Sequence, residues 1–563
     1  MNNEPIRGDA PVPASPNTPQ TPAPSGQPPA PDPAFPSYPV SRPAEPWQFS
    51  PPPTPRQPVP ASSLDGGMTL LVFAAAWCFL HLCWPGYMGL GMFLFTLFFA
   101  GIAVGYRLWS GSPIPRGSYV WLGVMLLSAA SFPILDNGLL SWLNLLFLML
   151  ITVYWVAVLG ENRVEPRLGK RLLADLLNHL FIVPFQNFGC FGTVLARSTA
   201  KTRLGKNLLI GAVTLLCSFP VLWFVCQELS TVAAGFGELL EQFAEVISLQ
   251  NILSATTLFA IPTAFYLYGL LYGNQHKRYT GGVTAEKLDE AAKKRRVLPP
   301  AAAYALLSVL CLIYALFFVI GAAELITFSR GGALTPYDYS QFAREGFFEL
   351  CRVSVVNLLV LWGIWLLLDT SSQRSSVPAR IFYSLLCCQT LLLIALALCK
   401  MGLYIHFCGV TWLRVSTTWF MVLLAVIFGL MLLFQFREIP LVRWTAAAFC
   451  VLFLALCWMD LDRLVVKNAI WRYEETGDAM AISYGALVEH SVAGAPELYE
   501  LWLRESAKES SPVEPELVRL LETAARWTRY PKEELGGFGH WNLQRAQAWS
   551  LCRQFLPQPE LEP

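Results

Sequence analysis

The stretch from Leu139 to Leu159 reads LLSWLNLLFLMLITVYWVAVL and contains no charged side chain. About 20 apolar residues in a helix are enough to cross a hydrocarbon core of roughly 30 Å, so this stretch predicts a membrane span. The composition of the whole 563-residue chain agrees, because 54% of it is hydrophobic and 14% is charged, against about 45–50% and about 25% in soluble domains. The sequence excludes a soluble globular protein and predicts an all-α, polytopic membrane protein.

Apolar windows of this kind recur from Met68 to Met459, and we count about eleven of them. They define a transmembrane domain over residues 67–460. The windows are approximately Met68 to Trp84, Tyr87 to Tyr106, Tyr119 to Leu135, Leu139 to Leu159, Leu208 to Gln227, Ile252 to Gly273, Ala301 to Gly321, Leu350 to Leu368, Ile381 to Cys399, Val415 to Phe436 and Leu441 to Met459.

The basic residues of the loops predict the orientation, because loops on the cytoplasmic side are enriched in Lys and Arg. With the N terminus inside, the inside loops carry 21 Lys and Arg residues and the opposite loops carry 5. This asymmetry supports an odd number of spans, with the N terminus in the cytoplasm and the C terminus outside it. We expect a multi-pass membrane protein.

The first 66 residues differ in composition from the rest of the chain. Of the 41 prolines, 21 lie between Met1 and Pro60. Proline removes amide donors and fixes φ, so this segment cannot build a core and is expected to be a disordered, proline-rich cytoplasmic tail.

After the last span, residues 461–563 become polar and keep a helical periodicity. Leu517, Leu520, Leu521, Ala524 and Thr528 follow the spacing of one helix face. Further helices are expected over 462–476, 496–508 and 541–555. The region is predicted to be a small helical domain outside the cytoplasm.

Charged residues gather at the predicted outer ends of the later spans. Charges near membrane depth cost several kcal/mol unless they are paired, so a group of them is either a binding site or a set of mutually neutralising ions. Both interpretations stay open, and mutual neutralisation is at least as well supported. The candidate ligand or partner residues are Glu324, Glu345, Glu349, Arg352, Asn357, Lys400 and Arg414.

A second polar segment lies between two earlier spans, where a basic amphipathic helix precedes His179, Gln186 and Asn187. It can be interpreted as a lipid or effector site, although an interfacial connector without a ligand is favoured. Asn144 and Asn357 are expected to form hydrogen bonds between helices within the membrane.

Several chemistries find no support in the sequence. It lacks the P-loop, the H-E-x-x-H helix and the G-x-S-x-G elbow, and its cysteines and histidines have no metal-ligand spacing. We therefore expect no catalytic residue, no metal and no cofactor, and consider an enzyme less favoured. The formal net charge of +1 also gives no field that would attract nucleic acid.

Three groups of residues resemble a family of bacterial multi-pass proteins that is catalogued as domains of unknown function 4153 and 4173. They are the Ala-Arg-Glu-Gly-Phe-Phe-Glu-Leu stretch between Tyr339 and Asn357, the Gly-Val-Thr-Trp-Leu-Arg stretch from Gly409 to Arg414, and Asp462 to Gly477 with Asn468, Arg472 and Tyr473. The resemblance covers roughly 68–503. It implies a bacterial plasma-membrane protein with a helical outer segment, and supplies no substrate, cofactor or catalytic residue.

The leading hypothesis is a non-enzymatic membrane scaffold or envelope-sensing, regulatory component. Its partners would be membrane lipids and an unidentified membrane or envelope protein. The alternative is a transporter or a membrane enzyme that acts on a lipid or small solute at the outer polar cluster.

Overall fold

The computed structural model describes residues 59–83, 88–199, 255–296, 298–329, 347–368, 377–529 and 539–556, and every regular element among them is a helix. This confirms the all-α fold class. The predicted tail over 1–66 lies almost entirely outside the described residues.

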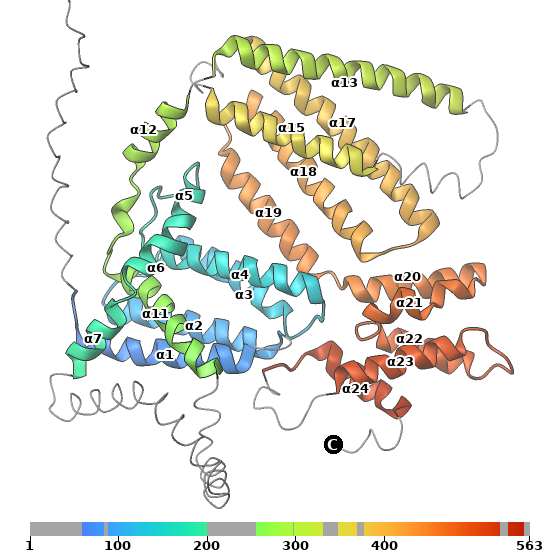
Figure 1. Ribbon diagram of the computed structural model, residues 1–563, viewed down its shortest axis with the longest axis horizontal. Coiled ribbons are helices and arrows are strands. Elements are labelled where there is room, and N and C mark those ends of the chain that lie inside the picture. Colours follow the sequence, from blue (N-terminus) through green and yellow to red (C-terminus); the bar gives the residue numbers. More distant parts are fainter. Residues whose placement is uncertain are drawn as a thin grey trace, which may run out of the picture. The chain divides into compact units, whose positions relative to one another are not determined.

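A first helix group packs around a common apolar core that includes Trp155, Met125 and Tyr268, each fully buried (Figure 1). Across its α3–α4 contact, Asn144 accepts a hydrogen bond from Ser128 Oγ at 2.7 Å and donates to the Ser128 carbonyl at 3.0 Å. The expected interhelical role of Asn144 is thus confirmed. The group contains α1 (Ser63–Cys83), α2 (Leu90–Trp109), α3 (Arg116–Ser131), α4 (Gly138–Leu159), α7 (Cys190–Thr199), α11 (Ala255–Gln275) and α19 (Leu441–Trp458).

The chain between α4 and α7 forms a broken helix rather than a simple connector. Its pieces α5 (Leu172–Leu177), a π-helical turn (Asn178–Ile182) and α6 (Val183–Gln186) run into each other, and the axis bends by 46° before α7. α6 packs closely on α11 because α11 has glycine where the two backbones meet. A Cβ at Gly269 would lie 2.4 Å from the Pro184 carbonyl oxygen. Small residues such as this glycine allow the backbones of two membrane helices to approach this closely.

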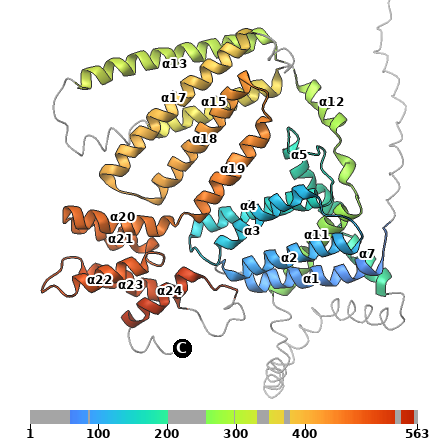
Figure 2. The same cartoon turned by 180° about the vertical axis from the view of Figure 1, so that it is seen from behind.

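A second helix group consists of α13 (Pro300–Ser329), α15 (Phe347–Leu367), α17 (Val377–Cys408) and α18 (Trp412–Phe436). The four helices surround their own core, with Leu386, Met421 and Phe428 fully buried, and both views show them side by side (Figure 2). Before them, α12 (Ala285–Arg295) is capped by Thr284, whose Oγ1 accepts from the Lys287 amide at 3.3 Å.

Eight described helices are long and apolar enough to cross a membrane, and the bent pair would make nine. They are α1, α2, α4, α13, α15, α17, α18 and α19, which match eight of the eleven predicted windows. Of the other three windows, one is α3, with 16 residues, one is α11, which has Pro262 in its interior, and the window over 208–227 lies outside the described residues.

The remaining helices form a C-terminal domain with a separate core. Leu517, Leu520, Leu521 and Ala524 are fully buried there, as their spacing predicts. The helical character predicted for residues 461–563 is thus confirmed for the described part of the region. Its helices are α20 (Leu461–Thr476), α21 (Tyr484–Leu487), α22 (Ala495–Glu505), α23 (Glu514–Thr528) and α24 (Leu543–Cys552), with short 3-10 turns at Ala479–Ile482, Val488–His490 and Arg553–Phe555.

Candidate functional site at the junction with the C-terminal domain

The predicted outer cluster is distributed over several surroundings. Glu349 and Arg352 form an i, i+3 ion pair at 2.9 Å on α15, with side chains 60% and 74% exposed. Asn357 is fully buried deeper in the same helix, where it accepts from Tyr314 Oη at 2.6 Å and donates to Thr390 Oγ1 at 3.0 Å. Asn357 therefore joins α13, α15 and α17, which confirms its interhelical role.

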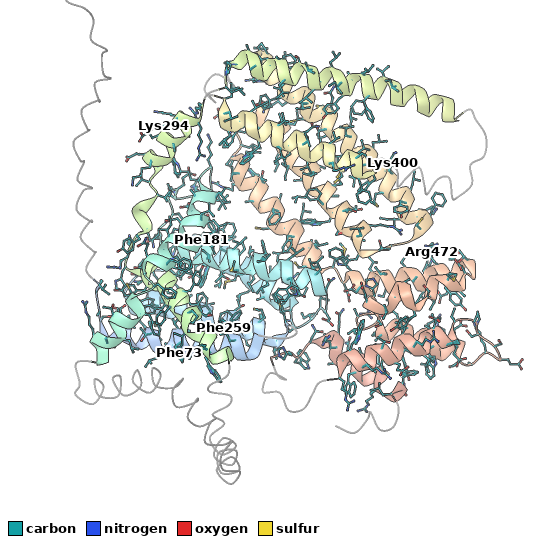
Figure 3. The ribbon with its side chains drawn as sticks, in the orientation of Figure 1. Phe73, Phe181, Phe259, Lys294, Lys400 and Arg472 are labelled. Carbon is teal, nitrogen blue, oxygen red and sulfur yellow. The ribbon has the colours of Figure 1, made fainter. Side chains whose placement is uncertain are left out.

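Lys400, Glu324 and Glu345 are described to different extents. Lys400 is half-buried in the last third of α17 (Figure 3). Glu324 belongs to α13, but its side chain is not described, and Glu345 lies outside the described residues.

Arg414 stabilises the turn between α17 and α18. Its Nη1 donates to the carbonyl oxygens of Cys408 at 2.8 Å and Gly409 at 2.5 Å, and its guanidinium lies 4.1 Å from the centroid of the Tyr404 ring. A cation bound to the last carbonyls of a helix compensates the negative end of the helix dipole. The charge of Arg414 is thus used to hold this turn in place.

The same turn meets α20, so two of the three groups that carry the family resemblance come together. Gly409 has φ +81°, a conformation that favours glycine, and a Cβ there would lie 2.6 Å from Arg472 Nη1. The next amide, that of Val410, donates to Asn468 Oδ1 at 2.8 Å. Figure 3 shows Arg472 on the side of α20 that faces this turn.

A second contact joins the C-terminal domain to the first helix group. At the start of α24, the Leu543 amide donates to the Pro133 carbonyl at 2.8 Å, and Nδ2 of the N-cap residue Asn542 donates to the Phe132 carbonyl at 2.8 Å. In the other direction, the Leu90 amide at the start of α2 donates to the Trp541 carbonyl at 2.9 Å. The segment before α24 therefore holds both the start of α2 and the α3–α4 turn.

Charged and amide side chains reinforce this second contact. Arg545 Nε donates to Asp136 Oδ2 at 2.7 Å, and the Arg545 side chain is only 5% exposed. Gln544 accepts from the Asp136 amide at 2.6 Å and donates to Asp460 Oδ2 at 2.5 Å, so it connects the α3–α4 turn with the segment between α19 and α20. Burial raises the pKa of Asp460, although the Arg463 amide and charge act in the opposite direction.

Inside the C-terminal domain, Glu505 is the centre of a buried polar group. Burial by itself would raise the pKa of this carboxyl, but hydrogen bonds from Lys508 Nζ at 2.6 Å and Ser511 Oγ at 2.7 Å outweigh that effect, so the pKa is lowered. The Tyr473 hydroxyl also hydrogen-bonds this carboxylate. Tyr473 follows Arg472 directly, so α20 joins the α17–α18 turn to the interior of the domain.

The structure also contains a polar site that the sequence did not reveal. At the opposite ends of the first-group helices, Asp65 Oδ1 accepts from Tyr106 Oη at 2.5 Å and lies 2.9 Å from His276 Nε2. Asp65 is 1% exposed and brings the ends of α1, α2 and α11 together. An acid at the start of one span and a histidine at the end of another would have been the signal, but nothing in a single sequence indicates that they meet.

The segment that follows His276 inserts Arg278 beside the break in the α5–α7 helix. Arg278 is 5% exposed, and its Nε donates to Asn187 Oδ1 at 3.0 Å. Asn187 and His179 are both fully buried, and His179 Nδ1 lies 2.8 Å from the Asp175 carbonyl. One face of this segment is therefore packed on the helix group, while Gln186 and the apolar Phe181 and Phe185 remain exposed.

Two observations on the described residues bear on ligand binding. No group of three or more His, Cys, Asp or Glu residues among them has the geometry to hold a metal ion. A cavity of about 10 Å³ near the α3–α4 turn has room for about one water molecule. It is lined by Ser131, Phe132, Leu135, Asn137, Leu140, Ser141, Asn144 and Cys457.

Comparison with known proteins gives one match. A family model described as "Domain of unknown function (DUF4153)" matches residues 122–501, which include the second helix group, the first helix group except α1, α2 and the start of α3, and most of α20–α22. No curated protein and no solved structure matches the chain. The match confirms the resemblance that was drawn from the residues near Gly409 and Arg472.

Proposed function

We propose that this chain, which belongs to the DUF4153 family, is a non-enzymatic membrane scaffold or envelope-sensing component. In this proposal the C-terminal domain contacts a partner, and the membrane helices transmit or receive the change of state. The N terminus would lie in the cytoplasm and the C-terminal domain outside it, in a bacterial plasma membrane. The loop charges support this orientation.

The observation that carries the proposal is the double attachment of the C-terminal domain. One contact joins α20 to the α17–α18 turn through Asn468, and the other joins the first turn of α24 to the α3–α4 turn through Arg545 and Asp136. The two contacts reach different helix groups. A domain that is bonded to both can respond to their relative movement, and a partner that binds the domain can influence both.

The use of the charges also favours a scaffold over a catalytic or transport site. Arg414 is bound to carbonyl groups of its own chain, and Asn357 satisfies its amide within the membrane helices. Glu349 and Arg352 pair with each other on an exposed surface, where such pairs contribute little energy. These groups have structural roles that require no substrate.

The test is co-purification from native membranes. The tagged full chain is compared with a chain that ends after Met459 and with the R545A variant, which keeps every other side chain of the domain. We expect a membrane or envelope protein to co-purify with the full chain, to be lost from the truncated chain and to be reduced with R545A. Equal recovery with all three would refute the role of the domain.

A solute-binding measurement distinguishes the alternative. Small solutes and lipid headgroups are screened against the purified full chain, and binding is repeated with R352A and R414A, each checked for a monodisperse elution profile. Binding that is abolished by both substitutions would refute the scaffold proposal in favour of a transporter or a membrane enzyme. Unchanged thermal stability with every solute would agree with the scaffold.

A further inference from the structure

α20 is attached near the ends of membrane spans at its start and again from its middle onward. It begins at Leu461, three residues after α19 stops at Trp458. Near its middle, Asn468 bonds the turn between α17 and α18, and one helical turn later Arg472 lies against the same turn. Figure 1 shows α20 running from the end of α19 past that turn. A helix attached at two span ends must run along the surface of the membrane rather than away from it.

The faces of α20 have different surroundings. Val465, Val466 and Ile470 are buried in the core of the C-terminal domain. Leu464 and Trp471, seven residues apart and therefore on one stripe of the helix, are 40% and 53% exposed. Within the described residues, this apolar stripe is covered neither by the domain core nor by the α17–α18 turn.

The residue types on this stripe suit a lipid headgroup layer. Tryptophan is enriched at membrane interfaces because its ring is apolar while its N–H still finds a polar partner. Lys467 lies between the two apolar residues, and its Nζ is 3.5 Å from Glu497 Oε1 of α22. Its side chain is 56% exposed, so its stem can lie along the stripe while the exposed side of the ammonium faces the headgroup layer. The stripe also continues from the end of α19, where Trp458 and Met459 are 39% and 41% exposed.

We propose that α20 is an interfacial helix whose Leu464, Lys467 and Trp471 stripe contacts phospholipid headgroups and the adjoining acyl chains. The C-terminal domain then has a lipid-binding surface in addition to its two contacts with the helix groups. This inference does not depend on the scaffold role, because it follows from the placement of α20 and needs no protein partner.

The experiment uses the full chain reconstituted in vesicles of phosphatidylcholine and phosphatidylglycerol. A photoreactive benzoylphenylalanine replaces Leu464 in one variant and Trp471 in another, and the lipid adducts are measured by mass spectrometry after irradiation. The matched control replaces Leu503 of α22, which is 49% exposed, lies in the same domain and has no described bond to a span end. Each variant is first shown to elute as the unmodified chain does.

We expect several-fold more lipid adduct at positions 464 and 471 than at position 503. Adduct yields at 464 and 471 that do not exceed the yield at 503 would overturn the proposal. A strong cross-link from either position to a second copy of the chain, in place of lipid, would also overturn it. Co-purification of a protein partner measures the scaffold role separately, so either idea can fail while the other stands.

Discussion

Removing the Arg545 guanidinium is expected to open the contact between α24 and the α3–α4 turn. Removing one partner of a buried ion pair lowers the stability by about 3–5 kcal/mol, because the other charge remains buried without compensation. In R545A the remaining Asp136 side chain is 24% exposed, so water can solvate it in part and we expect a cost of about 2 kcal/mol. In D136A the guanidinium is 5% exposed, and we expect about 3 kcal/mol.

The coupling between the two residues is the decisive quantity. The double variant removes both charges and leaves no buried ion, so its cost should fall short of the sum of the single costs by about 2 kcal/mol. Since 1.4 kcal/mol is a factor of ten, this coupling corresponds to roughly 30-fold in the equilibrium for opening the contact.

Hydrogen exchange can measure that equilibrium directly. The Leu90 and Gly91 amides lie in the first turn of α2, where helical amides have no partner within the helix, and they donate instead to the Trp541 and Gly539 carbonyls. Their protection therefore reports the docked contact, and peptides from the middle of α4 serve as an internal reference. Strictly additive costs, or unchanged exchange of these two amides in R545A, would refute the reasoning.

Three further predictions concern single side chains. Gly409→Ala should destabilise the protein by about 1–3 kcal/mol, because Gly409 has a φ of +81° and lies close to Arg472. This loss should lower the thermal unfolding midpoint in detergent, whereas the control Gly402→Ala, which has open space around it, should not lower it. Equal midpoints for the two variants would contradict the prediction. Tyr106→Phe should lower the free energy of unfolding by about 1.5–3 kcal/mol, because it removes the hydrogen bond to the Asp65 carboxylate. Tyr119→Phe, at an exposed position, serves as the control. A smaller loss for Tyr106→Phe than for the control would refute the role of that bond. The lowered pKa of Glu505 means that its stabilising contribution is complete above its ordinary pKa of 4.5 and is lost as the pH falls through the lower folded pKa. Circular dichroism during acid titration should show a weaker pH dependence in Glu505→Gln, and an unchanged dependence would count against the buried network.

The parts of the fold that depend on local sequence were predictable, and those that depend on contacts between distant residues were not. Apolar length identifies a span by itself, which is why Leu139 to Leu159 coincides with α4. The face of α23 was equally clear, because its apolar spacing reflects one buried side. By contrast, Asp65 and His276 are separated by more than 200 positions, and neither has an unusual neighbourhood in the sequence. The charges proposed as one cluster could be named from the sequence, but which of them meet depends on the packing of α15, α17 and α20, and Arg414 binds the carbonyl groups of its own turn.

The C-terminal domain is hydrogen-bonded both to the α3–α4 turn and to the α17–α18 turn, so it links the two. If a thinner or laterally compressed bilayer changes the distance between the two turns, the two sets of hydrogen bonds cannot both stay intact. One set of hydrogen bonds must break first. The weaker of the two contacts would therefore determine how far the turns can move before the domain detaches from one helix group.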